Sequence, residues 1–196
     1  MKPILFNTEM VRAILDGRKS CTRWLVKFLL GENPKWTGYI KDGLMLYNGR
    51  NEPCIRTQPY QSGDILYVRE TWCKGLERYI YRADYSDTEK FYQDGKEINM
   101  KWQPSLHMPK EAARIFLRVT NVRVERLQEI TSEQICKEGV EVEDPYVLNG
   151  EEKRYAFSNL WNSTIKESDL DRYGWNANPW VWVIEFERCD KPESEG

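Results

Sequence analysis

The sequence predicts an α+β fold in which a mixed β-barrel is flanked by short helices and carries surface insertions. Three observations support this. Several segments show the residue pattern of strands, one long β segment changes its apolar face partway along, and short helices with clear capping signals separate the strands. The 196 residues suffice for one domain with a substantial core. We expect a single domain over 1–190, insertions near 28–60, 86–101 and 140–155, and a disordered tail over 191–196.

The chain opens with a short strand, PILF at 3–6, and a helix. The helix is indicated by four apolar residues that share one face at helical spacing: Met10, Val11, Ile14 and Leu15. Asn7 or Thr8 can cap its start, and Gly17 suits the left-handed position after its end. An extended segment, SCTRWLV, follows directly. Lys19, Thr22 and Arg23 therefore lie where the helix gives way to a strand.

A second strand is predicted within YQSGDILYVRETW, residues 60–72, after a turn at 62–64. Alternation places Leu66, Val68, Glu70 and Trp72 on one face. Glu70 is thus in line with apolar neighbours. Either the strand emerges into solvent there, or the carboxylate lies at the rim of a pocket.

A long β segment, AARIFLRVTNVRVERL, covers residues 112–127. Its apolar positions shift by one residue partway along, from Ile115, Leu117 and Val119 to Val122 and Val124. Such a shift indicates a bulge or bend, as a barrel needs at a corner. The closing segment WVWVIEFE, 180–187, is apolar on both faces, which predicts a central strand rather than an edge.

The clearest helix signal is ITSEQICKEG, residues 130–139. Thr131 and Gln134 form a capping box, Ile130 and Ile135 form a hydrophobic staple, and Gly139 ends the helix. Glu138 occupies the last turn, where the helix dipole disfavours a carboxylate but an exposed glutamate is tolerated. A third helix is expected around FSNLWNSTI, with three residues packed inward: Phe157, Leu160 and Trp161.

Composition excludes several classes of function. The net charge of −2 gives no general attraction to a polyanion, and a duplex DNA binder would be more basic. The five cysteines are scattered without a CxxC pair, which is typical of free thiols in a reducing cytosol. A single histidine rules out a multi-histidine zinc site. Without a secretory signal or an apolar run of membrane length, we expect a cytoplasmic protein with no cofactor or metal; the oligomeric state stays open.

The order of four motifs resembles the ASCH family of the PUA-like superfamily. These are GRKSCTR after the first helix, SGDILYVRE on a strand, TSEQICKEGV as a short helix, and WVWVIEFE as the closing strand. The family hallmark, of the type G-x-K-x-x-[ST/E]-x-R beside a β-barrel, falls on Gly17, Lys19 and Thr22. Arg23 follows Thr22 directly, whereas the usual spacing leaves one residue between them, so its guanidinium is expected to point differently. The resemblance implies a PUA-like barrel over most of the chain.

Within that family the chain is similar to the small bacterial N(4)-acetylcytidine amidohydrolases. Those enzymes hydrolyse the acetamide on the exocyclic nitrogen of cytidine with a lysine, a threonine and a glutamate. Carried over to this sequence, the three residues are Lys19, Thr22 and Glu138. The resemblance therefore implies an amidohydrolase for N(4)-acylcytidine or cytosine-type substrates. This chain is much longer than those enzymes, so its pocket walls and its substrate are expected to differ.

The implied triad suits amide hydrolysis chemically. A threonine hydroxyl is a nucleophile only when a base lies within hydrogen-bond reach, and a lysine can be that base when burial disfavours its ammonium form. Glu138 would position Lys19 or pass a proton to the leaving nitrogen. The alternative is that Lys19 is a surface lysine and that the hydroxyl of Thr22 caps the chain locally.

Five further residues are candidates for substrate binding: Arg23, Arg69, Glu70, Trp72 and His107. A carboxylate can accept from an amino group, and an indole can stack on a base. The alternatives are that Trp72 belongs to the core, that Arg69 and Glu70 form a solvated pair, and that His107, in the proline-bounded loop WQPSLHMP, caps a loop carbonyl.

An alternative function is an RNA-binding or RNA-cleaving ASCH module, with short single-stranded RNA as partner. It needs a basic stripe, and the candidates are Arg18, Lys19, Arg23, Lys27, Arg114, Arg118, Arg123 and Arg126. The last four are split between the two faces of the long β segment and interleaved with Glu125, which weakens the stripe. A nucleotide sensor without catalysis is a third interpretation.

Overall fold

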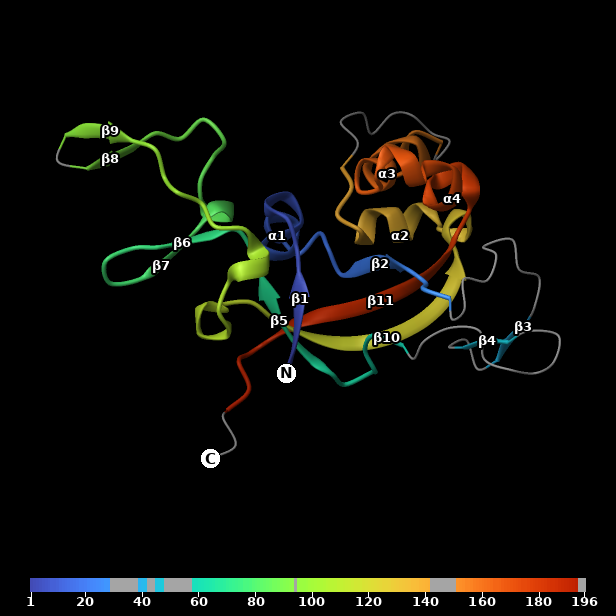
Figure 1. The fold of residues 1–196 in the computed structure, drawn as a ribbon. Coiled ribbons are helices and arrows are strands. Elements are labelled where there is room, and N and C mark those ends of the chain that lie inside the picture. Colours follow the sequence, from blue (N-terminus) through green and yellow to red (C-terminus); the bar gives the residue numbers. More distant parts are fainter. Residues whose placement is uncertain (29–38, 42–44, 48–57, 94, 142–150, 194–196) are drawn as a thin grey trace. The chain divides into compact units, whose positions relative to one another are not determined.

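A computed structural model describes residues 1–28, 39–41, 45–47, 58–93, 95–141 and 151–193 (Figure 1). The fold is mixed α+β, as predicted. The chain divides into two compact units, each built from segments far apart in the sequence. The first comprises Met1–Gly17, Asp64–Arg118 and Glu187–Gly196, and the second comprises Arg18–Gly63 and Val119–Phe186. The single-domain organisation stays a prediction.

In the first unit, β1 (Lys2–Leu5) pairs in parallel with β5 (Ile65–Arg69), and β5 pairs antiparallel with the start of β10 (Phe116–Arg126). Helix α1 (Thr8–Leu15) follows β1. The Asn7 side chain accepts from the Met10 backbone N–H at 2.8 Å, and Gly17 has a φ of +76°. The predicted cap and termination of this helix are confirmed.

The rest of the first unit consists of hairpins and 3-10 turns. One hairpin is β6 (Trp72–Lys74) with β7 (Tyr79–Tyr81); the other is β8 (Phe91–Gln93) with β9 (Lys96–Ile98), within the segment predicted as an insertion. The 3-10 turns are Arg82–Asp84, Ser105–His107 and Lys110–Ala112. A small core gathers Trp72, Met108, Ala112, Ala113 and Phe116. The face predicted for the second strand is buried at all four positions: Leu66, Val68, Glu70 and Trp72.

In the second unit, β11 (Trp180–Cys189) lies between β10 and β2 (Cys21–Leu25), and β11 and β2 are antiparallel with Ile184 opposite Thr22. The buried residues of β11 lie on both of its faces, so the prediction of a central strand is confirmed. Along β10 the buried positions shift as expected, from Val119 to Val122 and Val124. A hairpin of β3 (Tyr39–Lys41) and β4 (Met45–Tyr47) lies in the predicted insertion 28–60, most of which is outside the described residues.

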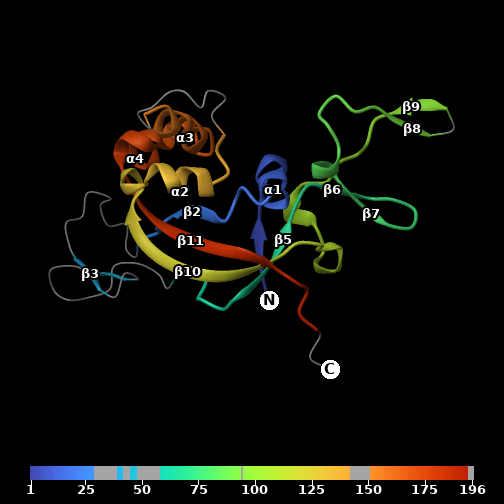
Figure 2. The same cartoon turned by 180° about the vertical axis from the view of Figure 1, so that it is seen from behind.

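Three helices of the second unit, α2 (Ser132–Lys137), α3 (Glu151–Ser163) and α4 (Leu170–Tyr173), lie over one face of β2 and β11 (Figures 1 and 2). The Thr131–Gln134 capping box is present, and Gly139 has a φ of +84°. Helix α3 begins within the segment 140–155 that was expected to be an insertion; residues 142–150 are outside the described part.

The expected inward packing of Leu160 is wrong, because this side chain is 37% exposed. Phe157 and Trp161 are four residues apart and define the buried face of α3 together with Ser158. Leu160 lies on the other side of Phe157 around the helix, away from the centre of that face.

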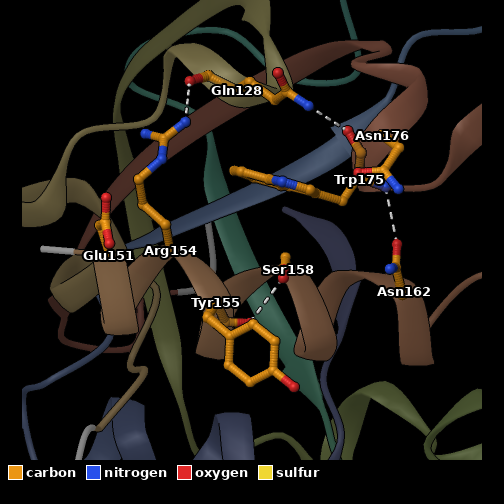
Figure 3. A pocket seen from close by; sticks show the side chains of 8 residues that line it. All are labelled: Gln128, Glu151, Arg154, Tyr155, Ser158, Asn162, Trp175 and Asn176. Carbon is orange, nitrogen blue, oxygen red and sulfur yellow. Dashed lines mark hydrogen bonds between the residues drawn. The ribbon is translucent and has the colours of Figure 1, made fainter.

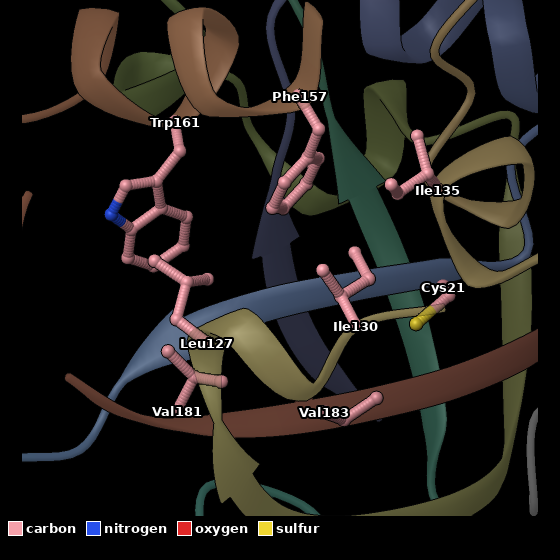
Figure 4. Packing of buried hydrophobic residues seen from close by; sticks show 8 residues of the cluster. All are labelled: Cys21, Leu127, Ile130, Ile135, Phe157, Trp161, Val181 and Val183. Carbon is pink, nitrogen blue, oxygen red and sulfur yellow. The ribbon is translucent and has the colours of Figure 1, made fainter. Parts of the chain in front are cut away.

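The main core of the second unit fills the space between these helices and the sheet (Figure 4). It contains Cys21, Leu127, Ile130, Ile135, Phe157, Trp161, Val181 and Val183. Both residues of the predicted staple belong to it. The face of β2 that carries Cys21 is therefore covered by helices, and any charged side chain on that face needs partners within the protein.

In the described part of the chain the sheets are open and do not close into a barrel. Among the helices that the structure describes, none is long and apolar enough to cross a membrane. Residues 194–196 of the predicted disordered tail lie outside the described residues.

Candidate functional site: a buried lysine–glutamate–arginine cluster

Lys19 and Glu138 meet in the second unit. Lys19 lies just before β2, and Glu138 is the residue that ends α2. The backbones of the two residues form an isolated β-bridge. Lys19 Nζ donates to Glu138 Oε2 at 2.7 Å, and the two side chains are 0% and 6% exposed. The structure thus joins two of the three predicted catalytic residues in a dry environment.

The amino group of Lys19 has further partners in the backbone. Nζ also donates to the carbonyl oxygens of Cys21 at 2.7 Å and of Glu138 at 2.9 Å. An ammonium group has three donors, and these contacts match that number. The lysine is therefore held rigidly, and the interpretation of Lys19 as a surface lysine is wrong.

Arg23 holds the other side of the same carboxylate. Its Nη1 donates to Glu138 Oε1 at 2.8 Å, and its Nη2 donates to Glu125 Oε1 at 2.7 Å and to Gln134 Oε1 at 3.1 Å. Burial alone would lower the pKa of the guanidinium, but Glu138 and the other acceptors raise the pKa above its ordinary value. Arg23 thereby ties β2 to β10 and to α2.

The cluster extends through Arg123. Its Nε donates to Glu125 Oε2 at 3.0 Å and its Nη1 to Glu185 Oε1 at 2.6 Å. We call the connected set Lys19, Arg23, Arg123, Glu125, Glu138 and Glu185 the ion network. It contains three cations and three carboxylates, so its formal charge is balanced.

Cys21 shares the network's face of β2. Its Sγ lies 3.7 Å from Arg23 Nη1. Burial in the first place, and then the charge of Glu138, raises the pKa of this thiol to about 12. The thiol therefore stays protonated at neutral pH and is not a ready nucleophile.

Thr22 points away from the pair. Successive side chains of a strand alternate between faces, so Thr22 lies on the opposite face of β2 from Cys21 and Arg23. It is buried, and in the described part of the chain its hydroxyl makes no hydrogen bond to Lys19 or Glu138. The structure does not bring this third residue of the implied triad to the other two.

The unusual position of Arg23 has a structural consequence. Lys19 and Arg23 are four residues apart and reach the same carboxylate, whereas Thr22 lies at an odd spacing from Lys19. Had one residue separated Thr22 from the arginine, alternation would have placed that arginine on the threonine's side. The shifted spacing is what gives Glu138 its second cation.

The other predicted binding residues belong to the first unit. Glu70 is 1% exposed and accepts from Arg114 Nε at 2.9 Å and from Arg114 Nη2 at 3.0 Å. Burial raises the pKa of Glu70, although Arg114 opposes this. The interpretation of Arg69 and Glu70 as a solvated pair is wrong: Arg69 Nε donates instead to the Met108 carbonyl at 2.8 Å.

Trp72 and His107 lie in different surroundings within that unit. Trp72 packs in the small core, and its Nε1 is buried without a partner in the described part of the chain. His107 is exposed in the turn Ser105–His107, and its imidazole makes no hydrogen bond among the described residues. Neither residue is brought to Lys19 and Glu138 by a contact that the structure describes.

Sequence reasoning missed the remaining members of the cluster. Gln134 was assigned to the capping box, which it does form, but the same Oε1 also accepts from Arg23. Arg123 and Glu125 are charged residues on β10, and Glu185 is one on β11; both are interior strands of the sheet. Charge on a central strand was the available signal, but the strand register that joins these residues is not readable from periodicity.

Comparisons of the chain with protein-family models, with curated proteins and with solved structures gave no match.

Proposed function

We propose that the protein is an amidohydrolase that removes the acyl group from the exocyclic amine of N(4)-acylcytidine or cytosine-type substrates, on a PUA-like fold. One observation carries the proposal: the 2.7 Å hydrogen bond between Lys19 and Glu138, residues 119 positions apart and both buried. These are the positions to which the ASCH resemblance assigns a catalytic lysine and glutamate. In this proposal they form the proton-transfer pair.

The pair can supply both functions that amide hydrolysis requires. A proton that moves from Nζ to Oε2 gives a neutral amine, which is a base, and a neutral carboxylic acid, which is a proton donor. The amine accepts the proton of the attacking group, and the acid protonates the leaving cytosine nitrogen. Arg23 Nη1 donates to the other oxygen, Oε1, which leaves Oε2 for this transfer.

Water fits the role of attacking group better than Thr22 does. An acyl-enzyme on Thr22 requires its hydroxyl to reach a substrate held at the Lys19–Glu138 pair, and the alternation of β2 directs the hydroxyl to the other face. Direct attack by water needs no such movement and balances as amide plus water giving acid plus amine. We therefore expect Thr22→Val to keep most turnover, whereas a threonine nucleophile predicts its loss.

The test is incubation of the full chain with N(4)-acetylcytidine, followed by chromatography for cytidine. The wild type should release cytidine. Lys19→Met and Glu138→Gln should each lower turnover by on the order of 100-fold or more, and the double variant should be scarcely worse than either because the two act as one unit. Lys19→Arg should not restore activity, since a guanidinium does not give up its proton.

Helix α2 offers a matched control. Lys137 and Glu133 form a hydrogen-bonded ion pair of the same length, 2.7 Å, on the exposed face of that helix. Lys137→Met and Glu133→Gln make the same chemical changes and should leave turnover unchanged. Absence of cytidine with the wild type would overturn the proposal. So would full turnover per folded molecule in the Lys19 and Glu138 variants, which would make the pair a purely structural link.

The alternative of an RNA-binding or RNA-cleaving module finds less support in the geometry. Arg23, Arg114 and Arg123 of the expected basic stripe are bound to carboxylates. A salt-dependent filter-binding curve on short single-stranded RNA separates the two functions, because phosphate contacts give a steep slope.

A further inference from the structure

A pocket of about 510 Å³ lies beside α3 in the second unit, in the volume range of small-ligand sites (Figure 3). Its walls come from the 3-10 turn Leu127–Glu129, from α3 and from the turn Trp175–Ala177. It is lined by Gln128, Glu151, Arg154, Tyr155, Ser158, Asn162, Trp175 and Asn176. None of these residues belongs to the ion network.

The position of Trp175 in this pocket is fixed mainly through its backbone. Its backbone N–H donates to Asn162 Oδ1 at 2.8 Å, and its carbonyl accepts from Gln128 Nε2 at 2.8 Å, as the dashed lines in Figure 3 show. The ring also packs edge-on against Phe157, with centroids 6.0 Å apart. Side chains from α3 and from the turn Leu127–Glu129 thus hold both backbone polar groups of Trp175, which preorganises the position of this residue.

Carboxamide groups in the pocket retain hydrogen-bonding capacity. In the described part of the chain, Asn176 makes no side-chain hydrogen bond, the amino group of Asn162 has no partner, and the side-chain oxygen of Gln128 has none. A carboxamide presents a donor and an acceptor side by side. The edge of a nucleobase offers the complementary pattern, which is why Asn and Gln recognise bases.

The charges in the pocket favour an uncharged ligand. The guanidinium of Arg154 donates to the carbonyls of Ile130 at 2.7 Å and Gln128 at 2.8 Å, and it lies 5.2 Å from the centre of the Trp175 ring. One donor from each of its two terminal nitrogens is therefore directed to the protein's own backbone rather than to a phosphate. Glu151 is the one carboxylate among the lining residues.

We infer that this pocket binds a neutral nucleoside, with the base against the indole of Trp175 and its polar edge at Asn176 and Asn162. Stacking on an aromatic ring accepts any base, and the carboxamides supply the edge contacts. A neutral sugar also packs on indoles, so the test includes methyl glucoside as a competing ligand. The inference does not depend on the amidohydrolase proposal, because binding is measured directly.

The test uses the ¹⁵N-labelled full chain titrated with cytidine and with adenosine. The side-chain amide signals of Asn176 and Asn162 and the indole N–H signal of Trp175 should shift and saturate. Asn176→Ala should weaken binding by about threefold to tenfold, the effect of one or two hydrogen bonds. Asn159 is exposed on the same helix α3 and does not line the pocket, so Asn159→Ala is the matched control and should bind like the wild type.

Two further ligands distinguish a neutral nucleoside from a phosphorylated nucleotide and from a sugar. Adenosine monophosphate should bind no more than a few-fold differently from adenosine, since Arg154 is directed to backbone carbonyls; binding ten times tighter would overturn the assignment to a neutral ligand. Methyl glucoside should leave the three signals in place. The inference is also overturned if millimolar nucleoside shifts none of them, if the sugar shifts them and nucleosides do not, or if Asn159→Ala weakens binding as much as Asn176→Ala.

Discussion

The two units each bury a glutamate against an arginine, but they do so differently. Glu138 is bound by Lys19 and Arg23, whose side chains are as buried as its own, and each carboxylate oxygen has its own cation. Among the residues that the structure describes, Arg114 alone binds Glu70, through both carboxylate oxygens. That arginine is 27% exposed and also binds Asp84 at the surface.

The two sites differ in whether water can solvate the charged groups. Water reaches Arg114, so solvent partly compensates the charge of this arginine. Its contact with Glu70 is a bidentate, charge-assisted hydrogen bond, which is among the stronger side-chain contacts. Water does not reach Lys19 or Arg23, so every charge there depends on another charge in the protein. Buried ion pairs seldom add net stability, yet losing one member is costly. The ion network therefore fixes the positions of β2, β10 and α2 more than it stabilises the fold.

The largest effect is expected when Glu138 is removed. Glu138→Ala leaves the buried cations Lys19 and Arg23 without their shared carboxylate and should lower the free energy of unfolding by about 3–5 kcal/mol. Glu70→Ala should cost less, about 1–3 kcal/mol, because Arg114 keeps Asp84 and contact with water. Urea unfolding followed by circular dichroism measures both. Equal losses would show that the exposure of the cation does not govern the cost.

The next largest effect is expected at Lys19. Lys19→Met keeps most of the side-chain volume but deprives Glu138 Oε2 and two backbone carbonyls of their donor. We expect a loss of about 3 kcal/mol, at the lower end for a broken buried pair, because Arg23 still binds the other oxygen of Glu138. Lys137→Met on the exposed face of α2 is the control and should change the urea midpoint little. A stable Lys19→Met protein would mean that the lysine is not needed for the fold.

Local features of the fold were predictable because their causes are local. The Asn7 cap, the Thr131–Gln134 capping box and the left-handed glycines at 17 and 139 follow from side chains that act within a few residues of themselves. The central position of β11 was predictable for the same reason, because apolar residues occupy both faces of this strand. Leu160 was misplaced because the centre of a helix face depends on which neighbours cover it.

The ion network was only partly predictable because its partners are joined by tertiary structure. Lys19 and Glu138 were selected through the family resemblance, and nothing in periodicity pairs Glu125 with Arg23 or Arg123 with Glu185. Thr22 illustrates the opposite error. A spacing of three brings residues together on a helix, but on an extended strand it separates them to opposite faces. The sequence predicted an extended segment here, and its alternation already places Thr22 on the face opposite Cys21 and Arg23.

A smaller effect is expected from pH at Glu70. Burial raises the folded-state pKa of this carboxyl above its ordinary value of 4.5. At pH values between the ordinary pKa and the raised pKa, the folded state binds more protons than the unfolded state. The free energy of unfolding should therefore fall as pH rises through that window. Glu70→Gln removes the titration and should flatten this part of the stability curve, measured by urea unfolding at a series of pH values. A Glu70→Gln curve that runs parallel to the wild type would contradict the raised pKa.

The smallest effect is expected at the outer end of the ion network. The Arg123 side chain is 25% exposed, nearly the same as Arg114, so the two arginines can be compared at matched exposure. Arg123→Gln leaves Glu125 still bound to Arg23 and leaves Glu185 partly in water, so the loss should be about 0.2–1 kcal/mol. Arg114→Gln instead leaves the buried Glu70 without its only cation among the described residues, and should cost about 1–3 kcal/mol. Urea midpoints of the two variants decide the matter. If the two variants lose the same stability, the loss depends on how exposed the arginine is. If Arg114→Gln loses more, the loss depends on how buried the remaining carboxylate is. The second result would also explain why the buried Glu138 depends on both of its cations.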